Sequence, residues 1–422
     1  MPEPRGRLPH LLQEFSIPLI VGVFAALWYA NLSPDLYEYY WGGSHDHEHW
    51  LPFGQLSVFG HPITLNFLVN EIFMVFFFGI AAKEITEATL PGGSLHPLRK
   101  AVNPLLATAG GVLGPAAFFF ASLGACFSLG VYDADASFAA LSRGWGIPTA
   151  TDIALVWLAA RACFGRGHPA IDFLLLIAVV DDAIGLGIIA IFYGDPNTPA
   201  NPLYLALIGI GMGLAFALRR AGVQSWVPYI FGAGPLSWAG LTLAHLHPAL
   251  ALVFIVPFLP GPQRDVGLFV GADEADRMGE ALAEDLEVEH SPLHLFETRL
   301  KGFVDFGLFF FALANAGVVF SQLGPMTWIV LGSLVVGKTL GITLFGWLGT
   351  LAGFPLPSRM TKRDLVLSGF LAALGLTVAL FLASAAFTEL RLQGQAKMGA
   401  LLSGLVGVLA VLGVHGGRWL RR

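Results

Sequence analysis

Four ionisable residues lie deep inside long apolar segments, where water cannot solvate a charge. Asp152 lies in GWGIPTATDIALVWLAA, the pair Asp181 and Asp182 lies in IDFLLLIAVVDDAIGLGIIAIFY, and Lys338 lies in LGSLVVGKTLGITLFGWLGTL. Charges at such depth are costly and mark functional candidates. Adjacent helix positions point about 100° apart, so the two adjacent aspartates cannot face one ion equally. One aspartate can therefore line an ion site while the other pairs with Lys338.

Two of the helices that carry polar groups are expected to be interrupted. Pro148 removes a backbone donor, so its helix should break just before Asp152. A simple capping role for Asp152 is disfavoured, because it lies several residues beyond Pro148. Gly375 and its small neighbours indicate a second interruption before Thr377, whose hydroxyl could equally bond its own helix. Interrupted membrane helices present carbonyls and helix N-termini to ions.

These residue types favour an ion exchanger. Na⁺ and Li⁺ are hard cations that prefer oxygen ligands, and carboxylates that are buried close together also bind protons. A site that holds either a cation or protons, and opens to each side in turn, exchanges them. A sodium-coupled symporter for an organic anion would need an Asn, Gln or Arg cluster. An intramembrane aspartyl enzyme would need facing aspartates, which adjacent residues on one helix do not provide. We therefore expect a transporter without a cofactor and not an enzyme.

Composition indicates that a membrane holds these residues. Hydrophobic residues make up 55% and charged residues 12% of the 422, about half the charged share of a soluble domain. Apolar runs of about 17–25 residues, enough to cross a bilayer, recur along the chain. We expect an all-α polytopic membrane protein, a single transmembrane domain over residues 1–422, with helices at 14–31, 63–82, 102–130, 147–162, 170–193, 202–218, 226–244, 247–260, 303–321, 326–351, 364–388 and 396–416.

Loop charges give the orientation. Of the 23 Lys and Arg residues, all but Arg143, Arg391, Lys397 and the central Lys338 fall on the side of the N-terminus. The positive side of a membrane protein is cytoplasmic, so both termini are predicted to be cytoplasmic. Residues 32–62 form the longest outside loop, and residues 261–298 form an acidic inside segment, which we interpret as a solvated helix or connector.

Three further patterns are weaker. Residues 55–65 alternate apolar and polar around Phe59-Gly60, which predicts a short hairpin and an edge for a partner chain. The histidines at 45, 47 and 49, with Asp46 and Glu48, could bind a transition metal, but an exposed polar loop is the simpler interpretation. His245 and His247 near a helix break are candidates for proton relay, although satisfied helix-end histidines are commoner.

The sequence resembles the NhaA family of sodium/proton antiporters over nearly its whole length. The stretches GWGIPTATDIA, AVVDDAIGLGIIAIFY, ALANAGV, VGKTLGI and GLTVALFLASAAF occur in that family's order. The resemblance implies an inner-membrane exchanger of one Na⁺ for two protons, with inverted-topology repeats and two interrupted helices that cross. It implies that Asp182 is the main Na⁺ ligand, assisted by Asp152 and Thr151, that Asp181 pairs with Lys338, and that the hairpin joins a homodimer.

Departures from the family pattern concern regulation. Glu297 is kept in SPLHLFETRLKGF, but Thr298 and Lys301 replace histidines associated with the pH response. A family glutamate at the inner end of the second helix is Ala81 here, followed by Lys83 and Glu84. Asn70-Glu71 replaces an Asn-Asp pair, and Asp305 is an additional acid. With His247, we take Lys83, Glu84 and Glu297 as possible pH-response residues, and we expect a shifted or shallower pH activation.

Overall fold

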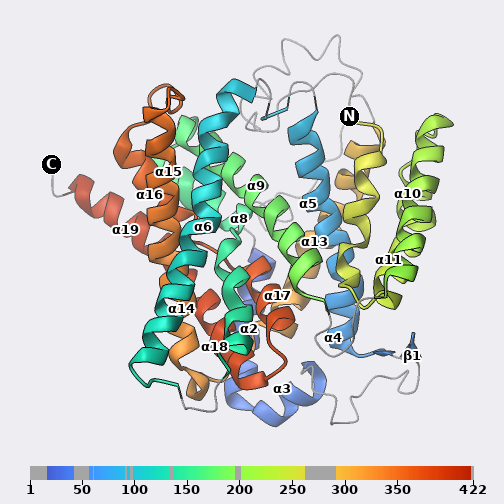
Figure 1. Ribbon diagram of the computed structural model, residues 1–422, viewed down its shortest axis with the longest axis horizontal. Helices are drawn as coiled ribbons and strands as arrows, with labels where there is room; N and C mark the ends of the chain where they lie inside the picture. Colours follow the sequence, from blue (N-terminus) through green and yellow to red (C-terminus); the bar gives the residue numbers. More distant parts are fainter. Residues whose placement is uncertain are drawn as a thin grey trace, which may run out of the picture. The chain divides into compact units, whose positions relative to one another are not determined.

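The computed structural model (Figure 1) describes residues 17–41, 57–59, 61–90, 93–95, 98–132, 137–194, 201–261 and 291–419. Within these ranges the chain is helical apart from one two-stranded antiparallel hairpin and the connections. It divides into two compact units, with residues 1–69, 102–189 and 305–422 in unit 1, and 70–101 and 190–304 in unit 2.

Unit 1 holds both predicted interruptions. Its helices are α2 (Ile17–Leu32), α3 (Pro34–Trp41), α4 (Leu65–Phe67), α6 (Leu98–Ser128), α7 (Phe138–Ser142), α8 (Ile153–Phe164), α9 (Pro169–Phe192), α14 (Pro325–Gly332), α15 (Thr339–Leu351), α16 (Lys362–Leu371), α17 (Thr377–Ala386), α18 (Leu390–Ser403) and α19 (Leu405–Trp419). It also contains the 3₁₀ segments η2 (Arg143–Thr149) and η7 (Phe320–Gln322), the π-helical turn η8 (Ser333–Lys338), and strands β1 (Ser57–Val58) and β2 (His61–Pro62).

Unit 2 is built around α5 and the short helical segments that pack against it. Its elements are the π-helical turn η1 (Leu68–Phe73, which begins in unit 1), α5 (Met74–Thr89), η3 (Pro202–Tyr204), α10 (Leu205–Arg220), η4 (Pro228–Ala233), α11 (Gly234–Leu243), η5 (Pro248–Phe254) and η6 (Val256–Phe258). Helix α13 (Pro292–Asn315) begins in this unit and continues into unit 1.

Every one of the twelve predicted segments overlaps a helical stretch. By length and apolarity alone, six described helices could each cross a membrane, or seven if the bent pair Phe138–Thr149 and Ile153–Phe164 is one span. Other predicted segments, such as α2, the stretch Pro248–Phe258 and α17, are apolar but shorter. The structure therefore fits an all-α polytopic architecture, and the number of crossings stays a prediction.

Four predicted boundaries are wrong. The helix predicted at 63–82 continues to Thr89, so Lys83 and Glu84 lie inside α5 rather than beyond its end. The loop predicted at 32–62 contains α3, which Pro34 opens and in which Tyr37 N–H bonds the Ser33 carbonyl at 3.0 Å. The helix predicted at 303–321 begins at Pro292, where the Ser291 hydroxyl accepts the backbone N–H of residue 294, and ends at Asn315. The last predicted helix, 396–416, begins earlier, at Leu390, so Lys397 lies buried in the middle of α18 rather than at its outer end.

The hairpin prediction is confirmed for the residues that can be compared. Ser57 pairs with Pro62 and Val58 with residue 61 in antiparallel register. Phe59 takes a positive φ of 51° at the turn, where such a conformation is needed to reverse the chain tightly. The histidine group at 45–49 and residues 262–290 of the acidic segment lie outside the described residues.

Close helix packing in unit 1 depends on small residues. A Cβ at Gly110 on α6 would overlap the backbone carbonyl of Gly341 on α15, and the same holds in reverse. Such direct backbone contact is possible only for glycine and is typical of helices in membranes. It brings α6 against the chain segment that carries Lys338.

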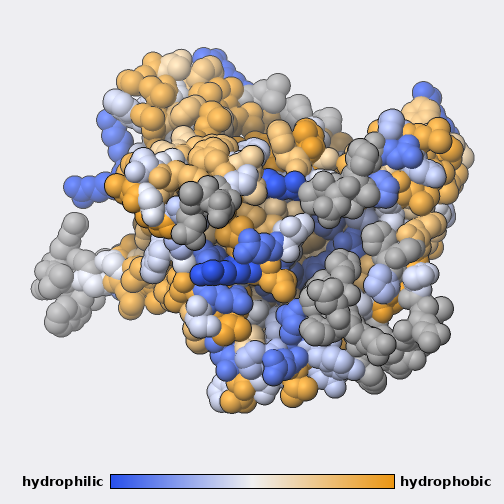
Figure 2. Space-filling model, turned by 60° about the horizontal axis from the view of Figure 1, so that its bottom comes forward, coloured by the Kyte–Doolittle hydropathy of each residue, from blue (hydrophilic) through white to orange (hydrophobic). Residues whose placement is uncertain are grey.

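The described surface is rich in apolar side chains. Figure 2 shows apolar residues over much of one face, interrupted by polar groups. More than half of the side chain is exposed at Trp28 on α2, Leu340 on α15 and Leu412 on α19. Exposed apolar surface on this scale fits helices solvated by lipid.

Candidate functional site

The two helix interruptions in unit 1 pack directly on each other. The first break (residues 150–152) separates η2 from α8, with a bend of 49°, and the second break (residues 372–376) separates α16 from α17. Asp152 N–H donates to the Leu374 carbonyl at 2.7 Å. A Cβ on Gly375 would lie 2.8 Å from the Ala150 carbonyl, so only glycine permits this approach. Both interruptions predicted from the sequence are confirmed.

Asp152 joins the two breaks through its side chain. It is the N-cap of α8, because its Oδ1 accepts the Leu155 N–H at 3.1 Å. Its Oδ2 accepts from the Thr377 hydroxyl at 3.0 Å and the Thr377 N–H at 3.3 Å. A capping role was not expected for Asp152, because it lies several residues beyond Pro148. That expectation is wrong: a new helix, α8, begins after the break, and Asp152 is its N-cap. The Thr377 hydroxyl bonds Asp152 rather than its own helix.

Lys338 and Asp181 form a fully buried ion pair in unit 1. Lys338 Nζ lies 2.9 Å from Asp181 Oδ2 and donates to the Thr149 carbonyl at 2.5 Å. Thr151 Oγ1 lies 2.8 Å from the same carboxylate oxygen and 3.2 Å from the Ala372 carbonyl. A buried ion pair is tolerated when further hydrogen bonds satisfy its groups, and here the Thr149 carbonyl and the Thr151 hydroxyl, at the first break, provide them.

The helix that carries Lys338 is locally widened. Residues Ser333–Lys338 form the π-helical turn η8, between α14 and α15. A π-turn adds one residue to the helical repeat and is frequent at functional sites. Lys338 stands at its last position, and Leu334 of the same turn would contact a Cβ on Gly375.

Asp182 follows Asp181 on α9 but has a different environment. Its exposed fraction is 8%, against 1% for Asp181, which lies in the ion pair. This difference agrees with the expectation that adjacent aspartates on one helix face different directions. Thr151 contacts Asp181 in the structure, whereas the family resemblance linked it to Asp182.

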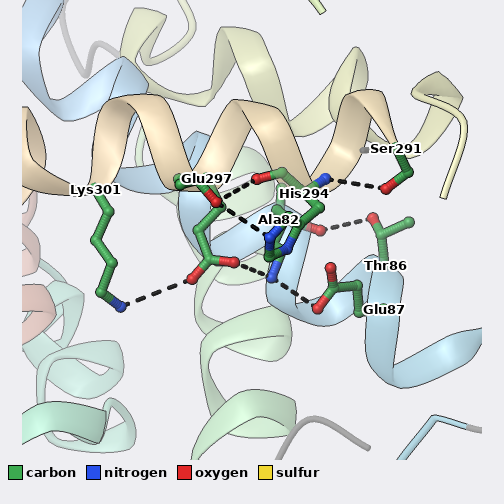
Figure 3. Close-up of polar contacts among 9 residues, drawn as sticks. Ala82, Thr86, Glu87, Ser291, His294, Glu297 and Lys301 are labelled. Atoms are coloured by element: carbon green, nitrogen blue, oxygen red, sulfur yellow. Dashed lines mark hydrogen bonds and ion pairs between the residues drawn. The ribbon is translucent and has the colours of Figure 1, made fainter. Parts of the chain in front are cut away.

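A second polar cluster lies in unit 2, between α5 and α13 (Figure 3). Lys83 on α5 pairs with Glu297 on α13 and, at 2.7 Å, with Glu87 one turn along its own helix. Lys301 lies 3.7 Å from the other oxygen of Glu297. Glu84 is half-buried and within electrostatic range of Lys83 and Lys301. The structure thus brings three of the four predicted pH-response residues together.

The fourth residue, His247, lies apart from that cluster within unit 2. Its Nδ1 is 3.8 Å from Glu71 Oε2, and it is the N-cap residue that precedes η5. Glu71 lies in the π-helical turn η1, and its carbonyl accepts the Trp238 indole N–H at 2.9 Å. Asp305 is half-buried on α13.

Glu297 responds to its cationic neighbours. Burial alone would raise the pKa of Glu297, but the ammonium groups of Lys83 and Lys301 outweigh it and hold this pKa below the ordinary value of 4.5. A depressed carboxyl pKa stabilises the fold above the unfolded-state value and loses that contribution as the pH falls through the folded-state value. Glu297 therefore stays ionised at neutral and alkaline pH.

We expect Glu297→Gln to lower the free energy of unfolding by about 1–3 kcal/mol at neutral pH, because it removes a charge-assisted bond from buried Lys83. The difference from wild type should shrink as the pH falls below about 4.5 towards the lowered folded-state pKa of Glu297, where the folded protein also binds the proton. Denaturant unfolding in detergent at several pH values measures it. Lys301→Met, on the exposed side of the same carboxylate, should cost only about 0–1 kcal/mol. An equal effect of both substitutions would contradict this account.

Sequence reasoning missed the groups that hold the breaks in place. The carbonyls of Thr149, Ala372 and Leu374 accept bonds from Lys338, Thr151 and Asp152, but a backbone carbonyl leaves no mark in the sequence. The buried hydroxyl of Ser403, which contacts the second break, was also missed. Its position among small residues of α18 was the available signal.

Comparison with known proteins agrees with this geometry. The family model described as Na⁺/H⁺ antiporter 1 matches residues 11–414. The chain belongs to this family. It is 55% identical over 402 residues to the Na⁺/H⁺ antiporter NhaA 1 of Pelobacter propionicus, covering 95% of this chain and 96% of that protein. It is 53% identical to the Na⁺/H⁺ antiporter NhaA of Geobacter sulfurreducens, with 96% of each chain covered.

Among solved structures, the sodium proton antiporter MjNhaP1 of Methanocaldococcus jannaschii matches with a TM-score of 0.48 and 14% identity, covering 83% of this chain and 85% of its own. Membership of the Na⁺/H⁺ antiporter 1 family confirms the resemblance inferred from the sequence motifs. Together with the apolar helices, it identifies an all-α polytopic membrane protein.

Proposed function

We propose that this chain exchanges Na⁺ or Li⁺ for protons across a membrane by alternating access, and thereby controls cellular Na⁺ and pH. The observation that carries the proposal is the pair of packed helix breaks, which gathers Asp152, Thr151 and Thr377 beside the Asp181–Lys338 pair. The family and the names of its relatives support the same activity.

The proposed chemistry is competition for oxygen ligands. Asp182 is the principal Na⁺ ligand, because it lies next to the buried pair yet keeps more exposure than Asp181. Asp152 assists, held at the junction of the breaks, and Thr151 contributes its hydroxyl. Asp181 pairs with Lys338, and we assign the exchange of the cation against protons to Asp182 and Asp152. By resemblance, two protons enter for each Na⁺ that leaves.

The topology, orientation, membrane location and assembly of the protein are proposed from its sequence and from the family resemblance. We propose a single transport domain of twelve crossings with inverted-topology repeats, in which the two interrupted helices cross. Both termini face the cytoplasm, and the protein lies in the inner membrane among lipid. The hairpin of residues 57–62 is the proposed contact of a homodimer.

The direct test uses inverted membrane vesicles that contain the full chain. A pH gradient is established, and Na⁺, Li⁺ or K⁺ is added in turn. We expect Na⁺ and Li⁺ to collapse the gradient, and vesicles without the protein to show no response. Because Thr298 and Lys301 stand where the family has the histidines associated with the pH response, repeating the assay across neutral and alkaline pH should give a shallow activation. No response to any of the three cations would refute antiport, and a steep activation would refute the predicted pH dependence.

A further inference from the structure

Ser403 contacts the second break from a neighbouring helix. It is the last residue of α18 and is completely buried. Its Oγ accepts the Gly375 N–H at 3.2 Å, and it lies 3.3 Å from the Gly375 carbonyl and 2.6 Å from the Ala400 carbonyl. One hydroxyl can thus accept from the peptide of Gly375 and donate to either carbonyl.

The second break needs this contact. Between α16 and α17 the helical hydrogen-bond ladder stops, and a buried N–H without a partner costs about 1–3 kcal/mol. Residues 372–374 still bond backbone carbonyls of α16, whereas the Gly375 N–H bonds the Ser403 hydroxyl. The absence of a side chain at Gly375 leaves its backbone held between α18 and Ala150 of the first break.

The same segment holds Asp152. Leu374, directly before Gly375, accepts the Asp152 N–H at 2.7 Å, and Thr377, two residues after it, donates two bonds to the Asp152 carboxylate. Any displacement of Gly375 therefore moves groups that fix both the backbone and the side chain of Asp152.

We infer that Ser403 is a positioning residue for the cation site, acting through Gly375 on Asp152 and so on the affinity for Na⁺. This inference rests on the proposed antiport. Groups behind a metal ligand typically change metal affinity about 10–100-fold when removed, even though they do not touch the ion. The sequence motifs of the ion site did not include Ser403.

The test compares Ser403→Ala with Ser368→Ala. Ser368 on α16 is equally buried, and its hydroxyl has no hydrogen bond within the described part of the chain. We expect Ser403→Ala to raise the Na⁺ concentration at half-maximal exchange about tenfold, with little change in the maximum rate per folded protein. Ser368→Ala should keep the wild-type half-maximal Na⁺ concentration and the wild-type maximum rate. The change in half-saturation separates positioning from simple loss of folded protein, which would lower only the rate.

Hydrogen exchange provides a second readout that does not require transport. The amide of Gly375 should exchange faster in Ser403→Ala than in wild type, measured on peptides that cover residues 372–377, and should be unchanged in Ser368→Ala. Wild-type half-saturation or wild-type protection at Gly375 in Ser403→Ala overturns the inference. Vesicles with the wild-type chain are included in the transport assay. If they show no cation/proton exchange, the proposed antiport is wrong, and the result does not bear on the role of Ser403.

Discussion

Asp182→Asn is expected to abolish Na⁺- and Li⁺-dependent exchange, lowering the rate at least about 100-fold, because the substitution removes both the negative charge and the proton-binding group of the principal ligand. Asparagine has the same shape, so α9 should keep its packing. The pH-gradient assay in inverted vesicles measures the rate, and detergent-solubilised protein should retain the wild-type unfolding temperature.

Asp172→Asn serves as the matched control. It is the same substitution on the same helix, but Asp172 is exposed in the first turn of α9. We expect it to retain exchange at close to the wild-type rate. Exchange that survives Asp182→Asn would remove Asp182 from the site while leaving antiport itself intact.

The second large effect concerns stability. Lys338→Met should lower the free energy of unfolding by about 3–5 kcal/mol, because it leaves the Asp181 carboxylate buried without its counter-charge. Asp181→Asn should be similarly destabilising, since Lys338 then keeps only the Thr149 carbonyl. Unfolding of purified protein in mixed detergent measures both.

The double variant Asp181→Asn with Lys338→Met distinguishes a coupled pair from two independent sites. Removing both charges relieves the desolvation of each, so we expect the double variant to be more stable than either single one. Additive losses in the double variant would show that the 2.9 Å pair is not the source of the effect.

The sequence predicted the site best where a residue type is compatible with only one kind of environment or backbone conformation. A lysine at membrane depth requires a carboxylate as its partner. In the structure, Asp181 is the carboxylate that pairs with Lys338. Pro148 predicts an interruption, and the helix restarts after Asp152. The choice between Asp181 and Asp182 could not be made from residue spacing alone, because it depends on which side of α9 faces Lys338 in η8.

The ends of helices and the partners of their polar side chains were harder to predict. Hydropathy placed the start of α13 at residue 303, because Glu297 and Lys301 make its first turns polar, yet Lys83 on α5 compensates Glu297. For the same reason the last helix was predicted to begin only at residue 396, although Lys397 lies inside α18 and its Nζ donates to Gln393 Oε1 at 3.1 Å. The long-range pair Lys83–Glu297 and the local bond between Lys397 and Gln393 thus allow polar stretches to form buried helix.

The π-helical turn η8 ends at Lys338, so the number of residues in this turn determines the direction in which Lys338 points. Because the π-turn accommodates one residue more than a regular α-helix, removing one residue between Ser333 and Gly337 would restore ordinary winding at nearly the same rotation. A further deletion, or an insertion, would rotate Lys338 by about 100° away from Asp181. The contact between Gly110 and Gly341 anchors the helix on the far side of the turn. Residue type is constrained here as well as length, because a Cβ on Gly337 would lie 2.7 Å from Pro115 Cα and Lys338 pairs with Asp181.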